Sequence, residues 1–143
     1  MTPDFSSIAP ADQPLTRPYW TALRQGQLQF QRCARCGHAW LPARAECPRC
    51  LAHDAQWEPA AGTGRLVSWV VFHRSYHPAF DHEVPYAVGI VELDEGPRMI
   101  ARIASAPDPE ALQLDQPMRL SIRKYGSTAV PCFVPGLVAG HKE

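Results

Sequence analysis

Two short cysteine pairs, Cys33-Ala-Arg-Cys36 and Cys47-Pro-Arg-Cys50, decide how the first half of this chain folds. Two residues separate the cysteines within each pair, and ten residues separate the pairs. Zinc takes four ligands in a tetrahedron and favours thiolate sulfur, and this spacing lets each pair direct both sulfurs at one ion. We therefore predict one zinc ion bound by Cys33, Cys36, Cys47 and Cys50. Because four thiolates fill the coordination sphere, the site is expected to be structural and not catalytic.

The region around the pairs, residues 27–58, alternates between extended pieces and tight turns. The extended pieces are LQFQR (28–32) and HAWLP (38–42), and Gly37 lets the chain turn behind the first pair. A segment this small buries too little apolar surface to fold unaided, so it needs an additional cross-link such as a bound zinc ion. A disulfide or a redox motif is the alternative, although a redox motif needs only one pair, placed where a helix follows a strand.

A short helix is predicted just before this region, in TRPYWTALRQG (16–26). Thr16 can cap its start, Pro18 suits its first turn, and Gly26 suits the position just past its end. The helix is amphipathic, so its apolar face must dock on a partner or on the rest of the chain. That face carries Tyr19, Trp20 and Leu23.

From Gly62 onward the sequence changes to strands rich in β-branched and aromatic residues, separated by turn-forming residues. The expected strands are GRLVSWVVFHR (64–74), YAVGIVEL (86–93), RMIARIA (98–104), MRLSIRKY (118–125) and AVPCFVP (129–135). A five-stranded antiparallel unit of this size indicates a small closed barrel, most commonly the OB-fold. One helical turn is expected at DPEALQ (108–113), and Cys132 is expected to be a buried, inert thiol.

The predicted fold class is therefore mainly β, with a short N-terminal helix, a zinc ribbon and a five-stranded OB-fold barrel. We divide the chain into four parts. They are a flexible tail (1–14), the helix with the zinc ribbon (15–58), the barrel (59–137) and a second tail (138–143).

The charge and composition of the chain argue against a nucleic-acid-binding protein and a membrane protein. The 143 residues are 45% hydrophobic and 20% charged, and Lys+Arg and Asp+Glu both number 14. This balance argues against a protein built mainly to neutralise a phosphate backbone, so nucleic acid is an unfavoured partner. The first 14 residues show no signal peptide, and no apolar stretch approaches the ~20 residues that span a membrane. We expect a cytoplasmic protein without a membrane partner, whose thiols stay reduced.

Three groups of side chains are candidates for contact with a ligand or partner. Four arginines crowd the zinc module and form either an anion site or a solvated face, and these are Arg32, Arg35, Arg44 and Arg49. A polar loop is expected to line a cleft at the barrel mouth or to contact a partner, and it holds His73, Arg74, Tyr76, His77, Asp81 and His82. Strand aromatics either stack on a ligand or pack in the core, and these are Trp69, Phe72, Tyr86 and Phe133.

The order of these motifs is specific. After the PYW helix come GQLQFQRC, the four-cysteine ribbon, a W-x-P, GTGRLVSWVVFHR, PYAVGIVELDEGPRMIARI and VPCFVPG. From about residue 16 to residue 136 the chain resembles the family of zinc-ribbon plus OB-fold proteins associated with acyl-CoA metabolism, long catalogued as a domain of unknown function. The resemblance implies a rubredoxin-like ribbon whose ligands are Cys33, Cys36, Cys47 and Cys50. It carries over no catalytic residue.

The resemblance implies a function as well. Family members accompany thiolases, lipid-transfer-protein-like thiolases and related enzymes, and some help to hold the pantetheine arm of an acyl-CoA. We therefore expect a non-catalytic accessory subunit of such an enzyme, with acyl-CoA as ligand and with a homodimer left open. Its contact residues are expected among Tyr19, Trp20, Arg35, Arg49, Trp69, Phe72, His73, Tyr76 and Tyr86. The alternatives are a nucleic-acid-binding module and an independent enzyme using His73, His77 or Asp81 as acid or base.

The chain departs from the family pattern at two turns. Family members usually have glycine after the last cysteine pair, where this chain has Leu51, and often have glycine before the fourth barrel strand, where it has Asp115. Both differences affect turn geometry, and neither touches the zinc ligands.

Overall fold

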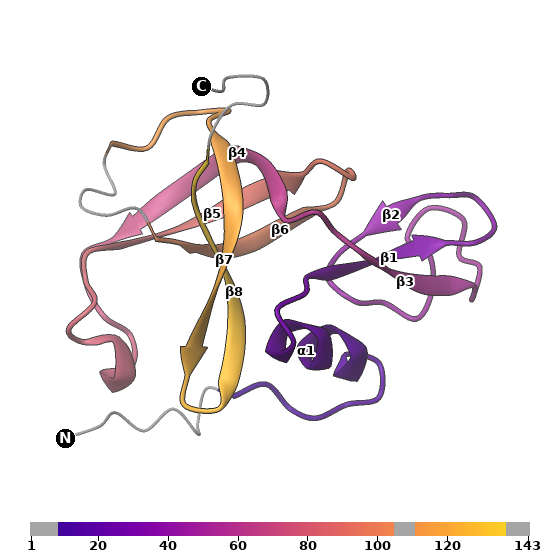
Figure 1. Cartoon of the computed structure of the whole chain (residues 1–143), viewed down its shortest axis with the longest axis horizontal. Coiled ribbons are helices and arrows are strands. Elements are labelled where there is room, and N and C mark those ends of the chain that lie inside the picture. The colour runs from indigo at the N-terminus through magenta and orange to yellow at the C-terminus, as the bar shows by residue number, and fades with distance from the viewer. Residues whose placement is uncertain (1–8, 105–110, 137–143) are drawn as a thin grey trace.

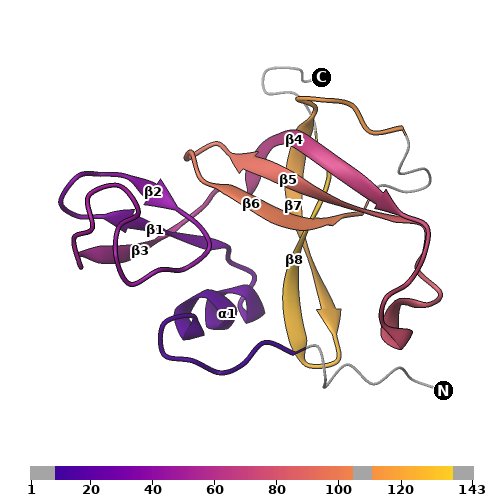
Figure 2. The same ribbon diagram turned by 180° about the vertical axis from the view of Figure 1, so that it is seen from behind.

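The computed structural model describes residues 9–104 and 111–136. One short helix precedes two separate sheets, a small one and a closed barrel (Figures 1 and 2). In chain order the elements are α1 (Arg17–Arg24), β1 (Gln29–Cys33), β2 (Ala39–Trp40), β3 (Ala55–Pro59), β4 (Thr63–Phe72), the 3-10 helix η2 (Pro78–Phe80), β5 (Tyr86–Leu93), β6 (Arg98–Ile103), β7 (Pro117–Tyr125) and β8 (Thr128–Pro135). The predicted fold class is confirmed.

Helix α1 ends as its sequence predicts. Pro18 lies in the first turn, where a missing N–H costs nothing. At the other end Gly26 has a φ of +85°, its N–H donates to the Leu23 carbonyl (3.0 Å), and the Gln27 N–H donates to the Ala22 carbonyl (2.8 Å). This paired arrangement is a Schellman motif, which needs a left-handed residue and so favours glycine.

The predicted cap at the start of α1 is wrong. Thr16 occupies the N-cap position, but its side chain makes no capping hydrogen bond. Its backbone is already in the right-handed helical region, with φ −98° and ψ −7°, whereas a capping side chain normally stands on an extended residue. The Thr16 hydroxyl instead lies 3.5 Å from the Gln13 carbonyl oxygen.

The small sheet has the strand order β2-β1-β3, with both pairs antiparallel. The first two strands fall in the predicted extended pieces. The third strand, β3, pairs along the whole of β1, from Gln29 opposite Pro59 to Cys33 opposite Ala55. It returns the chain from the second cysteine pair to the barrel, so β1 is the central strand of the ribbon.

The five barrel strands lie where the alternation of residues predicts them, and they close in the order β4-β5-β6-β8-β7. The expectation of a wholly antiparallel barrel is wrong, because β6 and β8 pair in parallel, with Arg102 opposite Cys132 and Ile103 opposite Phe133. Strand direction cannot alternate all the way round a closed ring with an odd number of strands. One parallel pair is therefore required, and it falls where the chain crosses over after β6.

The barrel and the N-terminal part share one hydrophobic core. Leu23 of α1 and Phe30 of β1 are 1% exposed and belong to the same buried cluster as Leu66 and Phe133 of the barrel. A second, smaller cluster surrounds the cysteines at the far end of the ribbon and contains Cys33, Trp40, Cys47 and Ala52. The helix and the base of the ribbon are thus fixed against the barrel by apolar burial.

Cys132 is fully buried, as predicted, and burial raises the pKa of its thiol. No helix in the described ranges is long and apolar enough to cross a membrane. The predicted tails (1–14 and 138–143) lie wholly or largely outside the described residues, as does the first half of the expected helical turn at 108–113. The division into parts at residues 58 and 59 stays a prediction.

Candidate metal centre and apolar groove

The four ribbon cysteines sit in two matching turns. Cys33 closes β1 and Cys36 lies in the turn before β2, while Cys47 and Cys50 lie in the connection from β2 to β3. In the first turn the backbone N–H groups of residues 35 and 36 donate to the Cys33 sulfur, both at 3.4 Å. In the second, those of residues 49 and 50 donate to the Cys47 sulfur at 3.3 and 3.4 Å. Such donors stabilise a thiolate.

The four sulfurs have the spacing that one zinc ion needs. All four Sγ atoms lie within 4.8 Å of one another. The sulfurs of Cys33 and Cys50 are 3.6 Å apart, as are those of Cys36 and Cys47. A tetrahedron with Zn–S bonds of about 2.3 Å has edges of about 3.8 Å, so the cluster can close on an ion with little movement.

The electrostatics of the turns favour the thiolate form at Cys33 and Cys47, whereas, despite a backbone hydrogen bond from Ala52, burial and the three neighbouring thiols raise the pKa of Cys50 to about 11. The N–H of Cys36 holds the pKa of Cys33 below its usual value, with a smaller contribution from Arg35. At Cys47 burial alone would raise the pKa, but the N–H groups of Cys50 and Arg49 bring it down to about 7. Zinc binds the thiolate form, and four thiolates leave no position for water or substrate. The arrangement therefore fits a structural ion.

The arginines of the ribbon do not converge on an anion site. Arg32 is held internally, since its Nε donates to the Glu58 carboxylate at 3.1 Å and its Nη1 to the Gly37 carbonyl at 2.9 Å. Arg35 and Arg49 are exposed, and their contribution to the site is the backbone N–H of each. The solvated-face interpretation of this cluster suits these contacts better.

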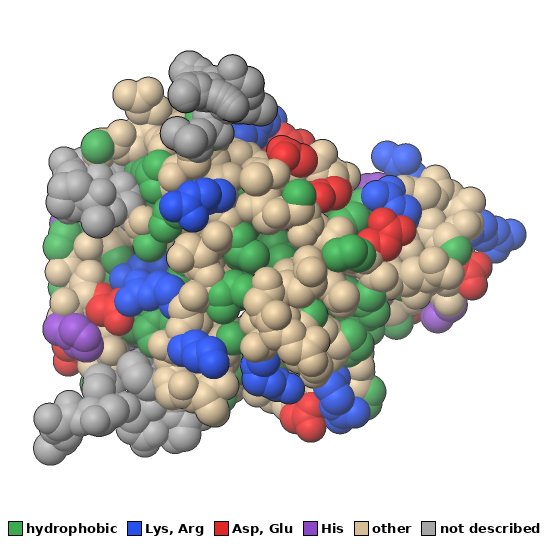
Figure 3. All heavy atoms as spheres, in the orientation of Figure 1, with side chains coloured by type: hydrophobic (Ala, Val, Ile, Leu, Met, Phe, Trp, Pro, Cys, Tyr) green, Lys and Arg blue, Asp and Glu red, His purple; other side chains and the backbone are tan. Residues whose placement is uncertain are grey.

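A groove of about 820 Å³ runs between the N-terminal part and the outer surface of the barrel. One wall comes from α1 and from the segment after β2, and the other from β5, β6 and β8. Figure 3 shows hydrophobic side chains gathered where the barrel and α1 meet, with Lys and Arg side chains spread around them. Its apolar lining includes Tyr19, Trp20, Leu41, Pro42, Val88, Ile90, Ile100 and Val130. Ile100 is 72% exposed, although it lies in the middle of β6.

A charged cluster that includes Arg102 contributes to the lining of this groove. The Arg102 Nη2 donates to Glu83 at 2.6 Å and its Nη1 donates to the Tyr125 hydroxyl at 3.3 Å. The guanidinium also lies over the Tyr86 ring, 4.2 Å from its centroid. Glu83 belongs to the segment between η2 and β5, so the pair ties this segment to β6. Phe80, on the same segment, packs edge-on against Tyr125 with ring centroids 5.4 Å apart.

The predicted contact residues do not form a single group. Tyr19, Trp20 and Tyr86 line the groove together. Phe72 and Tyr76 form an aromatic group beside Tyr86, with the Phe72 ring centroid 5.3 Å from that of Tyr86 and 6.1 Å from that of Tyr76. Apart from the groove, Trp69 packs against the barrel core, Arg35 and Arg49 lie at the ribbon tip, and His73 is exposed at the end of β4. Their roles stay untested.

Several groove residues were not singled out from the sequence, among them Leu41, Phe80, Ile100 and Arg102. One signal for the groove was available in β5. Its inward positions are buried, yet its outward positions begin with Tyr86, Val88 and Ile90, so the strand is apolar on both faces. A strand with one solvated face alternates apolar with polar residues, so apolar residues on both faces indicate a covered surface.

Comparison with known families gives two matches. The family profile described as "ChsH2, rubredoxin-like zinc ribbon domain" matches residues 20–55, and that described as "ChsH2, C-terminal OB-fold domain" matches residues 57–123. Among solved structures, the chain resembles one described as an Ltp2-ChsH2(DUF35) aldolase, with a TM-score of 0.79 and 33% identity. The match covers 90% of this chain and 99% of that one.

Several curated proteins are similar in sequence, among them the following three. A probable enoyl-CoA hydratase alpha subunit of Thermomonospora curvata is 34% identical over 83% of this chain and 37% of its own length. A DUF35 domain-containing scaffold protein of Methanothermobacter thermautotrophicus is 32% identical over 68% of this chain and 72% of its own. The benzoylsuccinyl-CoA thiolase subunit BbsA of Thauera aromatica is 29% identical over 59% and 56%. The chain thus spans 37% of the length of the first of these relatives.

Proposed function

Because the chain belongs to the ChsH2 family, whose members combine a rubredoxin-like zinc ribbon with an OB-fold domain, we propose that it is a non-catalytic accessory subunit of an acyl-CoA enzyme. In this role it binds a thiolase-like or lipid-transfer-protein-like enzyme and helps to hold or channel the acyl-CoA substrate. Relatives named as a thiolase subunit, a hydratase subunit and a scaffold protein support this direction.

The observation that carries the proposal is the apolar groove. Its volume of about 820 Å³ suits a ligand of the size of an acyl chain with its pantetheine arm. It is open, it lies at the junction of the ribbon, α1 and the barrel, and it exposes Ile100 where a strand would normally carry a polar residue. Such a surface is expected to be covered by a ligand, a partner or both.

The chemistry of the groove supports a holding role. Among the described residues that line it there is no cysteine, serine, histidine or carboxylate. These side chains are the usual nucleophiles and general bases, so the groove can bind an acyl thioester but has no evident means of attacking it. The reaction is therefore assigned to the partner enzyme.

We assign one structural zinc ion to Cys33, Cys36, Cys47 and Cys50. The spacing of the four sulfurs and the backbone donors of the two turns support this assignment. The ion would hold the ribbon together and would thereby fix the segment after β2, which contributes Leu41 and Pro42 to the groove. Reduced thiols are needed for this, which fits the cytoplasmic location we expect.

The nucleic-acid alternative receives no support from the relatives described above, and the balanced charge of the chain argues against it. A homodimer stays open. Both are outcomes that the experiment below can reveal.

The test is co-purification of the tagged, zinc-loaded chain from its native cell, followed by mass spectrometry. We expect a larger acyl-CoA enzyme to be retained, and its activity to fall when the chain is omitted from the reconstituted complex. Ile100→Glu should weaken acyl-CoA binding or retention of the enzyme, because it places a charge in the groove. Leu114→Glu is the matched control, since Leu114 is 67% exposed and lies outside the groove. Retention of no acyl-CoA enzyme by the unaltered chain would refute the proposal.

A further inference from the structure

A second cavity adjoins the groove beside α1. It measures about 420 Å³ and lies between α1, the segment that precedes it and the turn between β7 and β8. Three residues, Thr16, Trp20 and Thr128, line both cavities, so the two cavities adjoin at these side chains. An extended ligand that passes over these side chains can reach both cavities.

The two cavities differ in chemistry. The exposed surface of the groove is mainly apolar, although Arg98 and Arg102 belong to its lining and Arg102 is paired with Glu83. The second cavity is more polar, and it carries two guanidinium groups and four hydroxyl groups. These polar side chains are Thr16, Arg17, Thr21, Arg24, Ser127 and Thr128. Guanidinium and hydroxyl groups are the usual donors to phosphate oxygens.

Of the two arginines that line the second cavity, one is already paired with a carboxylate and the other can face a bound anion. Arg17 is engaged by Asp12, with its Nε 2.9 Å from the carboxylate. Arg24 forms no ion pair with any described residue, and its Nη2 instead donates to the Thr21 hydroxyl at 3.3 Å. Asp12 is the one carboxylate among the lining residues that the structure describes, so the net charge is about +1.

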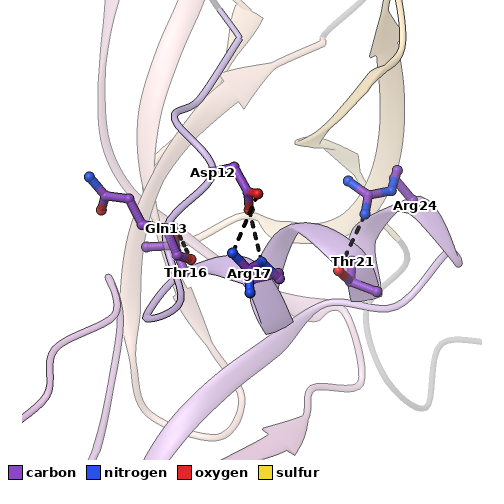
Figure 4. Close-up of polar contacts among 6 residues, drawn as sticks. All are labelled: Asp12, Gln13, Thr16, Arg17, Thr21 and Arg24. Atoms are coloured by element: carbon purple, nitrogen blue, oxygen red, sulfur yellow. Dashed lines mark hydrogen bonds and ion pairs between the residues drawn. The ribbon is translucent and has the colours of Figure 1, made fainter.

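The cavity already holds an anionic group. Figure 4 shows Asp12 next to Arg17, with Thr21 and Arg24 further along α1. Arg17 first, and Arg24 to a lesser degree, hold the pKa of the Asp12 carboxyl below its usual value. The arginines of this cavity therefore attract a negative charge placed where the Asp12 carboxylate lies.

We propose that this second cavity binds a phosphate group of the nucleotide part of the acyl-CoA whose apolar arm lies in the groove, with Arg24 as the principal cation. The inference rests on the proposed function, because it takes acyl-CoA as the occupant of the groove. It adds the position of the nucleotide end, which the relatives' names do not give. The ligand then runs from the turn between β7 and β8, past Trp20, along the outer faces of β8 and β6.

The test measures the affinity of the zinc-loaded full chain for two probes by titration calorimetry. Octanoyl-CoA carries the apolar arm and the phosphates, and octanoyl-pantetheine carries the arm alone. We expect octanoyl-CoA to bind about tenfold more tightly, as one charge-assisted hydrogen bond to a phosphate would give. Inorganic pyrophosphate, which has no apolar arm, should compete with octanoyl-CoA and not with octanoyl-pantetheine.

Variants then locate the phosphate. Arg24→Gln should lower the affinity for octanoyl-CoA about tenfold and leave that for octanoyl-pantetheine within about twofold. Asp12→Asn should raise the affinity for octanoyl-CoA, because it removes a competing negative charge, and a misfolded variant could not produce this gain. Arg119→Gln is the matched control, since Arg119 is exposed on β7 and lines neither cavity.

Two results would overturn the inference. If both probes bind equally, or if Arg24→Gln behaves like Arg119→Gln, the phosphates do not occupy the second cavity, although the groove still holds the acyl arm and the proposed function stands. If neither probe binds, the proposed function fails in its acyl-CoA part and this inference fails with it.

Discussion

Replacing Glu83 with glutamine should be one of the most destabilising single changes that leaves the core volume intact. Glu83 is 12% exposed and Arg102 is 15% exposed, so their ion pair is largely removed from water. Arg123 lies 3.8 Å from the same carboxylate oxygen, and the buried Nε of Arg102 has no hydrogen-bond partner among the described residues. Glu83→Gln therefore leaves two guanidinium groups facing each other without a counter-charge.

The size of the effect follows from this burial. Removing one partner of a buried ion pair costs about 3–5 kcal/mol, because an uncompensated charge stays behind. Glutamine keeps an amide oxygen that can still accept from Arg102, which restores about 1 kcal/mol. We expect a loss of about 2.5 kcal/mol, or about 8 °C in Tm for a chain of this length. Glu58→Gln, which breaks the half-exposed pair with Arg32, should cost only about 0.5 kcal/mol.

Urea denaturation of the zinc-loaded chain measures both losses, and a double-mutant cycle with Arg102→Gln isolates the coupling. Limited proteolysis should also cut the segment between β4 and β5 faster in Glu83→Gln, since the pair ties this segment to β6. Equal losses for Glu83→Gln and Glu58→Gln, or a coupling energy below about 0.5 kcal/mol, would refute the argument that burial makes this pair strong.

Three further outcomes are expected. Removing zinc with a chelator should speed amide hydrogen exchange in residues 33–54, while β4–β8 stay protected because the core that they share with α1 and β1 is separate from the cluster at the cysteines. Cys132→Ala should keep one zinc per chain by elemental analysis, and equally fast exchange in ribbon and barrel would contradict this expectation. Leu51→Gly should stabilise the chain by about 0.5 kcal/mol in urea denaturation, because Leu51 has a φ of +67° that glycine adopts without strain. Leu51→Ala should bring no gain in stability, because alanine is strained at the same φ. Burial raises the pKa of Tyr19 to about 12, so the stability that depends on its neutral hydroxyl is complete below about pH 10 and is lost as the pH rises from about 10 to 12. At pH 11 the expected loss in the free energy of unfolding is about 1 kcal/mol. If Tyr19→Phe showed the same dependence of stability on pH, Tyr19 would not be the cause.

Much of the fold could be predicted because its signals are local. Each barrel strand has its own alternation of residues, and each cysteine pair has its own turn. The parallel pairing of β6 with β8 could not be derived in this way, because it follows from closure of the whole ring and not from any one strand. The strand β3 has little β-branched character, and it is held in place by its pairing with β1.

The groove could be predicted less well, for a related reason. Trp20, Leu41 and Ile100 line it together, but they come from three segments far apart in the sequence. A single sequence indicates which residues are apolar, yet it does not indicate which apolar surfaces face each other. The two departures from the family pattern were more informative. Leu51 and Asp115 are the two non-glycine residues with positive φ in the described ranges, so both turns keep the backbone conformation that glycine would favour.

The core that α1 and β1 share with the barrel has a practical consequence for anyone who wishes to divide this protein. Leu23, Leu28 and Phe30 are each 1% exposed, and their neighbours Leu66 and Phe133 belong to the barrel. A fragment that begins at β4 would present these barrel side chains to solvent and would be prone to aggregate. A fragment or fusion should therefore keep the chain continuous from Thr16, so that α1 and the zinc ribbon stay attached to the barrel strands that they cover.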